Sequence, residues 1–356
     1  MEIYEEWVDR WKGLLISLVV LGHTVGVAGH FAQGAAKELL VYVFKVIYCF
    51  HMPAFFCVAG YLWRMKTEES WMAFFAKKFR RLMVPYLIFS FLSGVIYYVM
   101  SGAFSAAVHG ATDAYYAKMS GAPTVCGLLL SIIHAGGRPD NGVFCGNSVL
   151  WFLPAMFSVC VLYRFLDRWI RNMWGQLVVA LGCLIGSFYV PGGMPWGLSA
   201  AIFYLPFVIV GRWILPKVMF PRLNRVRTIS MLGAAYLAVC WITPNAYCRH
   251  LYLSWRVAFF ALALFGCWVS ALMARRLDVR LLVGWGLSSM GIMLMHKYII
   301  LAVGMKLPFV RALYASFPPI SIAITGIVTA LALMVSWWMT RVIDRYCPEA
   351  LGGRRK

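Results

Sequence analysis

Residues 8–23 read Val8-Asp9-Arg10-Trp11-Lys12-Gly13-Leu14-Leu15-Ile16-Ser17-Leu18-Val19-Val20-Leu21-Gly22-His23, so a charged start passes without a break into an apolar run that ends on a histidine. An ionisable side chain this deep in an apolar segment needs a reason. At about 100° and 1.5 Å per residue of α-helix, Lys12 and His23 lie on nearly the same helix face, about 16 Å apart along the axis. One face of one helix could therefore hold a ligand at its water end and act on it within the membrane.

The composition of the whole chain indicates the fold class. Of 356 residues, 62% are hydrophobic and only 13% are charged, which is too apolar for a chain that hides its side chains in one soluble core. We therefore predict an all-α, polytopic integral membrane protein with about ten transmembrane helices. The fifth and seventh of the apolar stretches are short. The ten stretches are 13–29, 39–62, 82–102, 148–166, 174–191, 197–215, 228–243, 253–273, 282–303 and 318–340.

The positions of the 33 lysines and arginines predict the orientation. With the N-terminus inside, most of them fall in cytoplasmic segments and few on the opposite side. By the positive-inside rule, we expect both termini in the cytoplasm. The net charge of +20 then mostly reflects the orientation of the chain in the membrane. The same basic residues also attract anionic lipid headgroups. Basic residues spread over short loops give little support to nucleic-acid binding, and we expect no nucleic-acid partner.

The chain shows no linker or low-complexity tract, so residues 1–356 are predicted to form a single integral-membrane domain. One outer loop, 103–147, is long and carries polar side chains able to hydrogen-bond a hydroxylated ligand. An ordinary solvated loop is an equal alternative. The ten cysteines show no metal-type CxxC spacing, and we expect no metal. Pairing of Cys126 with Cys145 is left open.

Three histidines fall within predicted spans. His23 could take a proton from a hydroxyl, although a buried neutral histidine bonded to a neighbouring helix is a frequent structural alternative. His51 stands before Pro53, which should kink its helix and free carbonyl groups, so a structural role for His51 is at least as favoured as a catalytic one. The role of His296 is left open. All 13 aspartates and glutamates fall outside the apolar cores, which disfavours a proton-driven pump.

A basic cluster directly precedes the third span. It contains Lys77, Lys78, Arg80 and Arg81, in which Lys77 with Arg80 and Lys78 with Arg81 stand three residues apart. Such pairs share a helical side and suit the phosphates of an anionic cofactor. The positive-inside rule alone would also place charges here.

Several short patterns occur in a fixed order along the chain. They are Asp9, Lys12-Gly13 and Gly22-His23; Phe50-His51-Met52-Pro53, Phe55-Phe56 and Gly60-Tyr61; Lys77 to Tyr86; Leu150-Trp151-Phe152-Leu153; Tyr204-Leu205-Pro206-Phe207 and Gly211; and Gly286, Ser288 and His296. In order and spacing the chain resembles the acyltransferase 3 family of integral-membrane acyltransferases, especially its branch similar to fucose 4-O-acetylase. The commonest form of the family has arginine where this chain has Lys12, so a bidentate contact is lost here while a point-charge contact survives.

The resemblance implies an O-acyltransferase that moves an acyl group, usually acetyl, from cytoplasmic acyl-CoA to a hydroxyl of a cell-envelope glycan or its lipid-linked precursor. It implies a bacterial inner (cytoplasmic) membrane and acetyl-CoA as the donor. His23 would be the general base, with Lys12 and His51 as further catalytic residues. The residues expected to bind the donor are Lys77, Lys78, Arg80, Arg81 and Trp151.

A transporter or flippase for a polar or lipid-linked envelope molecule is the alternative from another class. It would favour paired repeats, broken helices near mid-membrane and intramembrane charges. The sequence shows no clear internal repeat, and away from the span ends only Lys45 and Lys297 are charged within the spans. A membrane sensor that keeps the fold without the chemistry is a third alternative.

Overall fold

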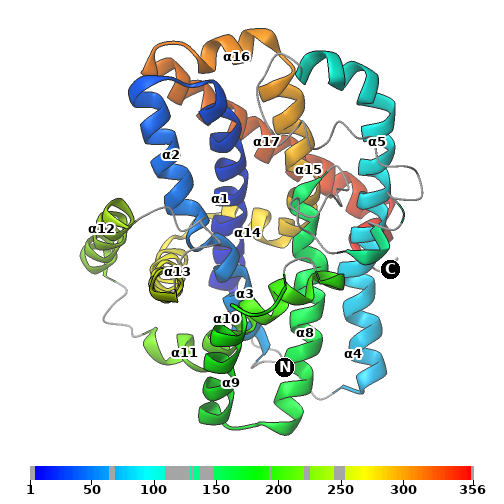
Figure 1. Cartoon of the computed structure of the whole chain (residues 1–356), viewed down its shortest axis with the longest axis vertical. Coiled ribbons are helices and arrows are strands. Elements are labelled where there is room, and N and C mark those ends of the chain that lie inside the picture. Colours follow the sequence, from blue (N-terminus) through cyan, green and yellow to red (C-terminus); the bar gives the residue numbers. More distant parts are fainter. Residues whose placement is uncertain are drawn as a thin grey trace. The chain divides into compact units, whose positions relative to one another are not determined.

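The computed structural model describes residues 5–63, 69–108, 129, 132–135, 147–191, 194–219, 225–243 and 253–353. Every regular element in these ranges is helical, which confirms the all-α prediction (Figure 1). The chain divides into two compact units. Unit 1 holds Met1–Thr67 and Phe207–Arg341, and unit 2 holds Glu68–Pro206 and Val342–Lys356.

The helices of unit 1 include the segments that carry all three intramembrane histidines. They are α1 (Glu6–Phe31), α2 (Gly34–Tyr48), α3 (His51–Trp63), α11 (Leu215–Val218), α12 (Val226–Ile242), α13 (Leu253–Arg276), α14 (Arg280–Leu287), α15 (Ser289–Ile300), the π-helical η6 (Leu301–Met305) and α16 (Pro308–Tyr314). Unit 2 holds α4 (Trp71–Lys78), the π-helical η1 (Phe79–Met83), α5 (Val84–Val108), η3 (Ser148–Trp151), α8 (Phe152–Trp169), α9 (Met173–Gly186), η4 (Pro195–Gly197) and η7 (Pro348–Leu351). Two helices, α10 (Leu198–Trp213) and α17 (Pro318–Tyr346), have residues in both units.

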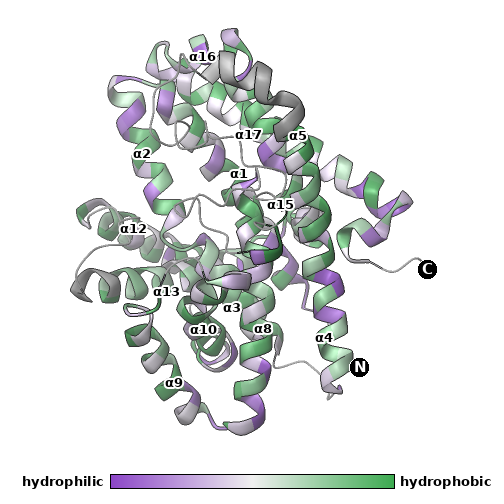
Figure 2. Cartoon of the chain, turned by 45° about the vertical axis from the view of Figure 1, so that its right-hand side comes forward, coloured by the Kyte–Doolittle hydropathy of each residue, from purple (hydrophilic) through white to green (hydrophobic). Residues whose placement is uncertain are grey.

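The helices are long and apolar enough for a polytopic membrane protein. Seven described segments could each cross a membrane, and the bent segment of α14 with α15 and η6 makes up to eight. Apolar residues line most of the helices (Figure 2). Large apolar side chains such as Trp241, Ile242 and Ile327 are more than half exposed, as lipid-facing side chains are. The two stretches predicted to be short are α9 and α12, with 14 and 17 residues. The total of ten spans and the cytoplasmic termini stay predictions.

Helical geometry is interrupted in two of the predicted spans, and the second is bent by more than 40° there. The stretch 39–62 forms α2 and α3 with a turn at Cys49 and Phe50, four and three residues before Pro53. The proline lacks an amide hydrogen and its ring collides with the carbonyl four residues back, so the helix breaks just there. The expectation of one continuous span at 282–303 is wrong in detail. The chain bends by 86° between α14 and α15, because Ser288 leaves helical geometry with φ −93° and ψ 7°.

Helix α1 packs against α14 through backbone contact within unit 1 (Figure 1). A methyl group built on Gly13 would lie 1.9 Å from the carbonyl oxygen of Leu282, and one built on Gly286 would lie 1.9 Å from that of Asp9. Small residues permit this close approach between membrane helices. Helix α1 also contacts α15, the helix that follows the 86° bend.

Most of the predicted outer loop 103–147, with Cys126 and Cys145, lies outside the described residues. A short piece, residues 132–135, is described and belongs to unit 2. The Tyr86 hydroxyl of α5 donates to the Ile132 carbonyl at 3.1 Å. At least this part of the loop segment is therefore tied to a helix of its own unit.

Candidate functional site

His23 is the partly exposed histidine of unit 1. It lies in α1 between two buried residues, Gly22 and Thr24, while its own ring keeps some exposure. Its Nδ1 atom is 3.2 Å from the hydroxyl of Tyr48, the last residue of α2. The two rings meet edge to face with centroids 6.0 Å apart. A hydroxyl group therefore fits against this ring nitrogen.

His51 begins α3 directly after the break and is 3% exposed. Its Nδ1 donates to the Ile47 carbonyl at 2.8 Å, so the side chain occupies an acceptor at the end of the broken helix. Its ring packs edge to face on Tyr48, with centroids 4.8 Å apart. The structural role that the sequence favoured for His51 agrees with this bond, and a catalytic role stays a prediction.

His296 completes the group from α15. It is fully buried, its Nδ1 donates to the Ile292 carbonyl at 2.9 Å, and its ring centroid lies 5.2 Å from that of His23. Sequence reasoning left His296 and Tyr48 out of the candidate site. The signal for His296 was present, since it is a histidine within an apolar span, as His23 is. Its distance of more than 270 residues from His23 along the chain hid the pairing.

The cluster of His23, Tyr48, His51 and His296, called the histidine cluster below, is held by backbone carbonyls and by ring packing. In the described ranges, no carboxylate is hydrogen-bonded to any of the three imidazoles. The same ranges contain no set of three histidine, cysteine or carboxylate side chains placed to ligate one metal ion. The cluster thus offers imidazole nitrogens and a phenol, which are groups that transfer protons near neutrality.

Lys12 lies eleven residues before His23 on α1 and does not join the histidine cluster. Its Nζ pairs with the Asp9 carboxylate at 2.5 Å, and the two side chains are 22% and 8% exposed. The buried Asp9 thus has its charge matched within one helical turn. The structure keeps Lys12 and His23 at two separate positions of one helix, and a catalytic role for Lys12 stays a prediction.

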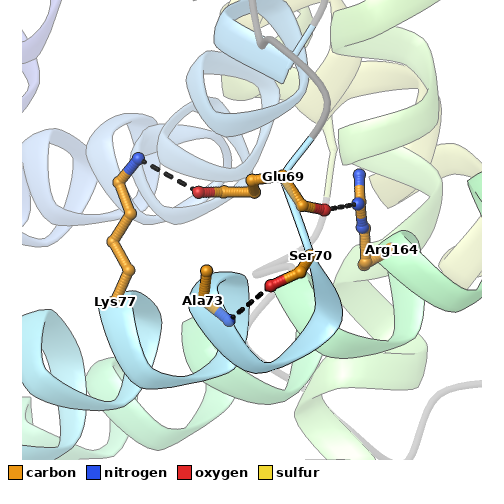
Figure 3. Close-up of polar contacts among 5 residues, drawn as sticks. All are labelled: Glu69, Ser70, Ala73, Lys77 and Arg164. Atoms are coloured by element: carbon orange, nitrogen blue, oxygen red, sulfur yellow. Dashed lines mark hydrogen bonds and ion pairs between the residues drawn. The ribbon is translucent and has the colours of Figure 1, made fainter.

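In unit 2, Lys77 lies at the end of α4 with its side chain 60% exposed (Figure 3). Its Nζ is 3.5 Å from the carboxylate of Glu69, whose backbone carbonyl accepts a bond from Arg164 at 2.5 Å. The Ser70 hydroxyl caps α4 by accepting from the amide of Ala73 at 3.2 Å. These contacts fix the start of the helix that carries the basic cluster.

The other members of the basic cluster differ in exposure. Arg81 is exposed like Lys77, whereas Lys78 and Arg80 are half-buried. The sequence grouped residues three apart, but exposure groups Lys77 with Arg81 and Lys78 with Arg80. Lys77 and Arg81 stand four residues apart, a spacing that also keeps two side chains on one helical side. Lys78 Nζ lies 5.9 Å from the ring centre of Phe74, a cation–π contact that partly covers it.

Trp151 ends η3 in unit 2 and stacks on Tyr204, with centroids 5.9 Å apart and an interplanar angle of 28°. The ring is half-buried. This contact joins two of the sequence patterns, Leu150 to Leu153 and Tyr204 to Phe207. Binding of the donor by Trp151 stays a prediction.

Comparison with known proteins supplies the family. A family model described as an acyltransferase domain (Acyl_transf_3) matches residues 5–341. The nodulation protein NolL of Mesorhizobium japonicum is 44% identical over 54 residues, which make up 15% of this chain and 14% of that protein. No solved structure matches the chain. Because the family model covers nearly its whole length, the chain belongs to the acyltransferase 3 family, and its long apolar helices are those of an integral membrane protein.

Proposed function

We propose that this protein transfers an acetyl group from cytoplasmic acetyl-CoA to a hydroxyl of a cell-envelope glycan or its lipid-linked precursor, in a bacterial inner membrane. His23 acts as the general base. The observation that carries the proposal is the position of His23: it is the part-exposed histidine of a buried cluster, with a hydroxyl group 3.2 Å from its Nδ1.

The chemistry needs few groups. His23 takes the proton of the acceptor hydroxyl while the oxygen attacks the thioester carbonyl, and the apolar surroundings limit competition from water. Phe44 stacks on Tyr48 at 3.8 Å between centroids and adds an aromatic wall to the histidine cluster. A neutral imidazole in such a setting is suited to accept a proton from an alcohol.

The basic cluster of unit 2 binds the phosphates of the donor. Lys77 and Arg81 are the exposed members and are open to an anionic ligand, whereas Lys78 and Arg80 contribute their charge from a half-buried position. Multiple cations on a short helical segment bind a polyphosphate through charge-assisted hydrogen bonds. In this proposal the charges of the basic cluster bind the donor in addition to setting the orientation of the chain in the membrane.

Of the features expected of a transporter, the described residues show a broken helix, where the chain bends by 86° between α14 and α15. Of the two lysines within the predicted spans, Lys45 donates its amine proton to the carbonyl of Thr243. That bond satisfies a helix-end carbonyl of α12, which is a structural use of the charge.

The test is transfer of labelled acetyl from acetyl-CoA in membranes that contain the wild-type protein, His23→Ala or His23→Asn. Both variants should lose activity, by about 10²-fold or more, because a general base is removed. His30→Asn is the matched control, since His30 lies on the same helix but is exposed in its last turn. Activity near wild type in a correctly inserted His23 variant would contradict the proposal.

The acceptor is identified by mass spectrometry of envelope glycans from cells with and without the gene. A mass difference of one acetyl group on one glycan would support the proposal and name the acceptor. A larger mass difference would replace acetyl by another acyl group. Uptake of a polar substrate into proteoliposomes without any CoA thioester would favour the transporter instead.

A further inference from the structure

His296 has a fixed tautomer and an unused ring nitrogen. Because its Nδ1 donates to the Ile292 carbonyl at 2.9 Å, the neutral ring carries its proton there and leaves a lone pair on Nε2. This Nε2 is buried, and no described residue hydrogen-bonds to it. A buried acceptor without a partner is costly and calls for an explanation.

The neighbour of this lone pair is His23. The two rings lie 5.2 Å apart between centroids at an angle of 39°. The Nδ1 of His23 already has a hydroxyl beside it, that of Tyr48 at 3.2 Å, so its remaining ring nitrogen is Nε2. His296 is 0% exposed while His23 is partly exposed, so an acceptor molecule reaches His23 first.

We propose that His296 is the positioning residue of His23, in place of the carboxylate that orients the base in many hydrolases. His23 carries its resting proton on Nε2 and keeps it there, and with substrate bound this N–H donates a hydrogen bond to Nε2 of His296. This fixes Nδ1 as the base nitrogen, and the hydroxyl of Tyr48 marks the place that the acceptor hydroxyl takes. The inference rests on the proposed function and adds to it the identity of the reacting nitrogen.

The step balances without any other reactant. The acceptor oxygen forms a bond to the thioester carbonyl carbon, and its proton moves to Nδ1 of His23. The carbon–sulfur bond then breaks, and the leaving thiolate takes that proton from Nδ1. His296 exchanges no net proton, because its lone pair only accepts the hydrogen bond from Nε2 and stabilises the imidazolium.

The other polar groups at the cluster do not replace His296. The Nδ1 proton of His51 is used by the Ile47 carbonyl, and its ring packs on Tyr48. Lys297 follows His296 on α15 and carries a positive charge, which opposes a second positive charge on His23. The lone pair of His296 offsets this repulsion by stabilising the positive charge on His23. In buried surroundings that stabilisation is larger than it would be in water.

Two substitutions at one position form the core of the test. His296→Asn keeps a donor for the Ile292 carbonyl but has no acceptor where Nε2 lies, whereas His296→Gln extends further and brings an amide oxygen to that place. For acetyl transfer in membranes, kcat of the Asn variant should be about 100-fold below wild type. The kcat of the Gln variant should be about tenfold higher than that of the Asn variant. KM for acetyl-CoA should stay within about twofold, because no donor contact is lost.

A third variant tests the choice of nitrogen and does not depend on residue 296. If Nδ1 is the base, Tyr48→Phe removes a hydroxyl that only occupies the acceptor's place, so its kcat loss should be much smaller than that of His296→Asn. The reverse order of losses would overturn the proposal, because it would mean that Tyr48 fixes the tautomer and that Nε2 is the base. Equal losses in His296→Asn and His296→Gln would also overturn it.

The proposal fails separately from the proposed function. An inactive His23→Asn with a fully active His296→Asn would overturn only the role of His296. A fully active His23→Asn would overturn the proposed function itself. Thermal unfolding of each purified variant in detergent identifies any that do not fold. If a variant at residue 296 does not fold, the kcat of Tyr48→Phe relative to wild type decides which nitrogen of His23 is the base.

Discussion

The histidine cluster of unit 1 and the basic cluster of unit 2 differ in almost every physical property. Two of the three imidazoles are buried, and each is fixed by the backbone carbonyl four residues before it, at 2.8 Å for His51 and 2.9 Å for His296. In the basic cluster, Lys77 and Arg81 are exposed, and the ion pair of Lys77 with Glu69 is loose at 3.5 Å. Fixed, buried groups are suited to a reaction that needs defined geometry. Exposed charges are suited to a flexible anionic ligand, which needs attraction more than exact placement.

The largest effect expected from this difference is on turnover. His23→Asn should lower kcat for acetyl transfer by about 10²–10⁴-fold and leave KM for acetyl-CoA within about twofold, since general-base catalysis acts on the transition state. Steady-state kinetics in membranes at saturating acceptor measures both constants. A raised KM with unchanged kcat would mean that His23 contributes to donor binding and not to the chemical step, which would contradict the separate roles given to the two clusters.

The complementary variant removes the exposed charges of unit 2. Lys77→Gln combined with Arg81→Gln should raise KM for acetyl-CoA by about tenfold while kcat changes little, because attraction for the phosphates is lost. The rise should shrink as salt increases, since ionic screening weakens the interaction in the wild type too. Arg227→Gln, an exposed charge at the start of α12, is the control and should behave as wild type.

The contact between α1 and α14 tests whether packing positions the histidine cluster. Gly13→Ala places a methyl group 1.9 Å from the Leu282 carbonyl, so the helices must separate, at a cost of about 1–3 kcal/mol. The melting temperature in detergent should fall by several degrees. Gly29→Ala, on the same helix with nothing within 4 Å of the added methyl, should melt at or slightly above the wild-type temperature. Equal melting of both variants would show that this contact does not hold the helices together.

The smallest effect is expected at Lys12. Lys12→Arg keeps the positive charge and the pairing with Asp9, so acetyl transfer should stay within about threefold of wild type. Lys12→Gln leaves the buried Asp9 without its partner and should lower the melting temperature more than Lys12→Arg does. If Lys12→Gln lowers kcat as much as His23→Asn does, Lys12 belongs with the histidine cluster in function despite its distance along α1.

Much of the fold could be predicted because hydrophobic length is a local property. The apolar stretches, the two short helices α9 and α12, and the break before Pro53 all follow from neighbouring residues. The 86° bend at Ser288 did not, since the serine pair Ser288-Ser289 carries no distinct signal by itself in an apolar stretch. Helix α1, far away along the chain, contacts both helices that flank the bend.

The candidate site was predictable only in part. His23 stood out because a histidine in an apolar run is unusual, and the basic cluster stood out as a run of charges. Which members of the basic cluster are exposed, Lys77 and Arg81, depended on what packs around the helix, and a run of charges does not show that. Tyr48 resembled any other aromatic residue of a membrane helix until the fold placed its hydroxyl 3.2 Å from His23.

Composition and ordered motifs, which are properties of the chain alone, suffice to identify a helical membrane protein of the acyltransferase 3 family. Which histidines meet depends on the packing of distant helices. His23 and His296 come together through the backbone contact of α1 with α14 and the bend that follows it, and such long-range packing depends on the shape of both helices at once.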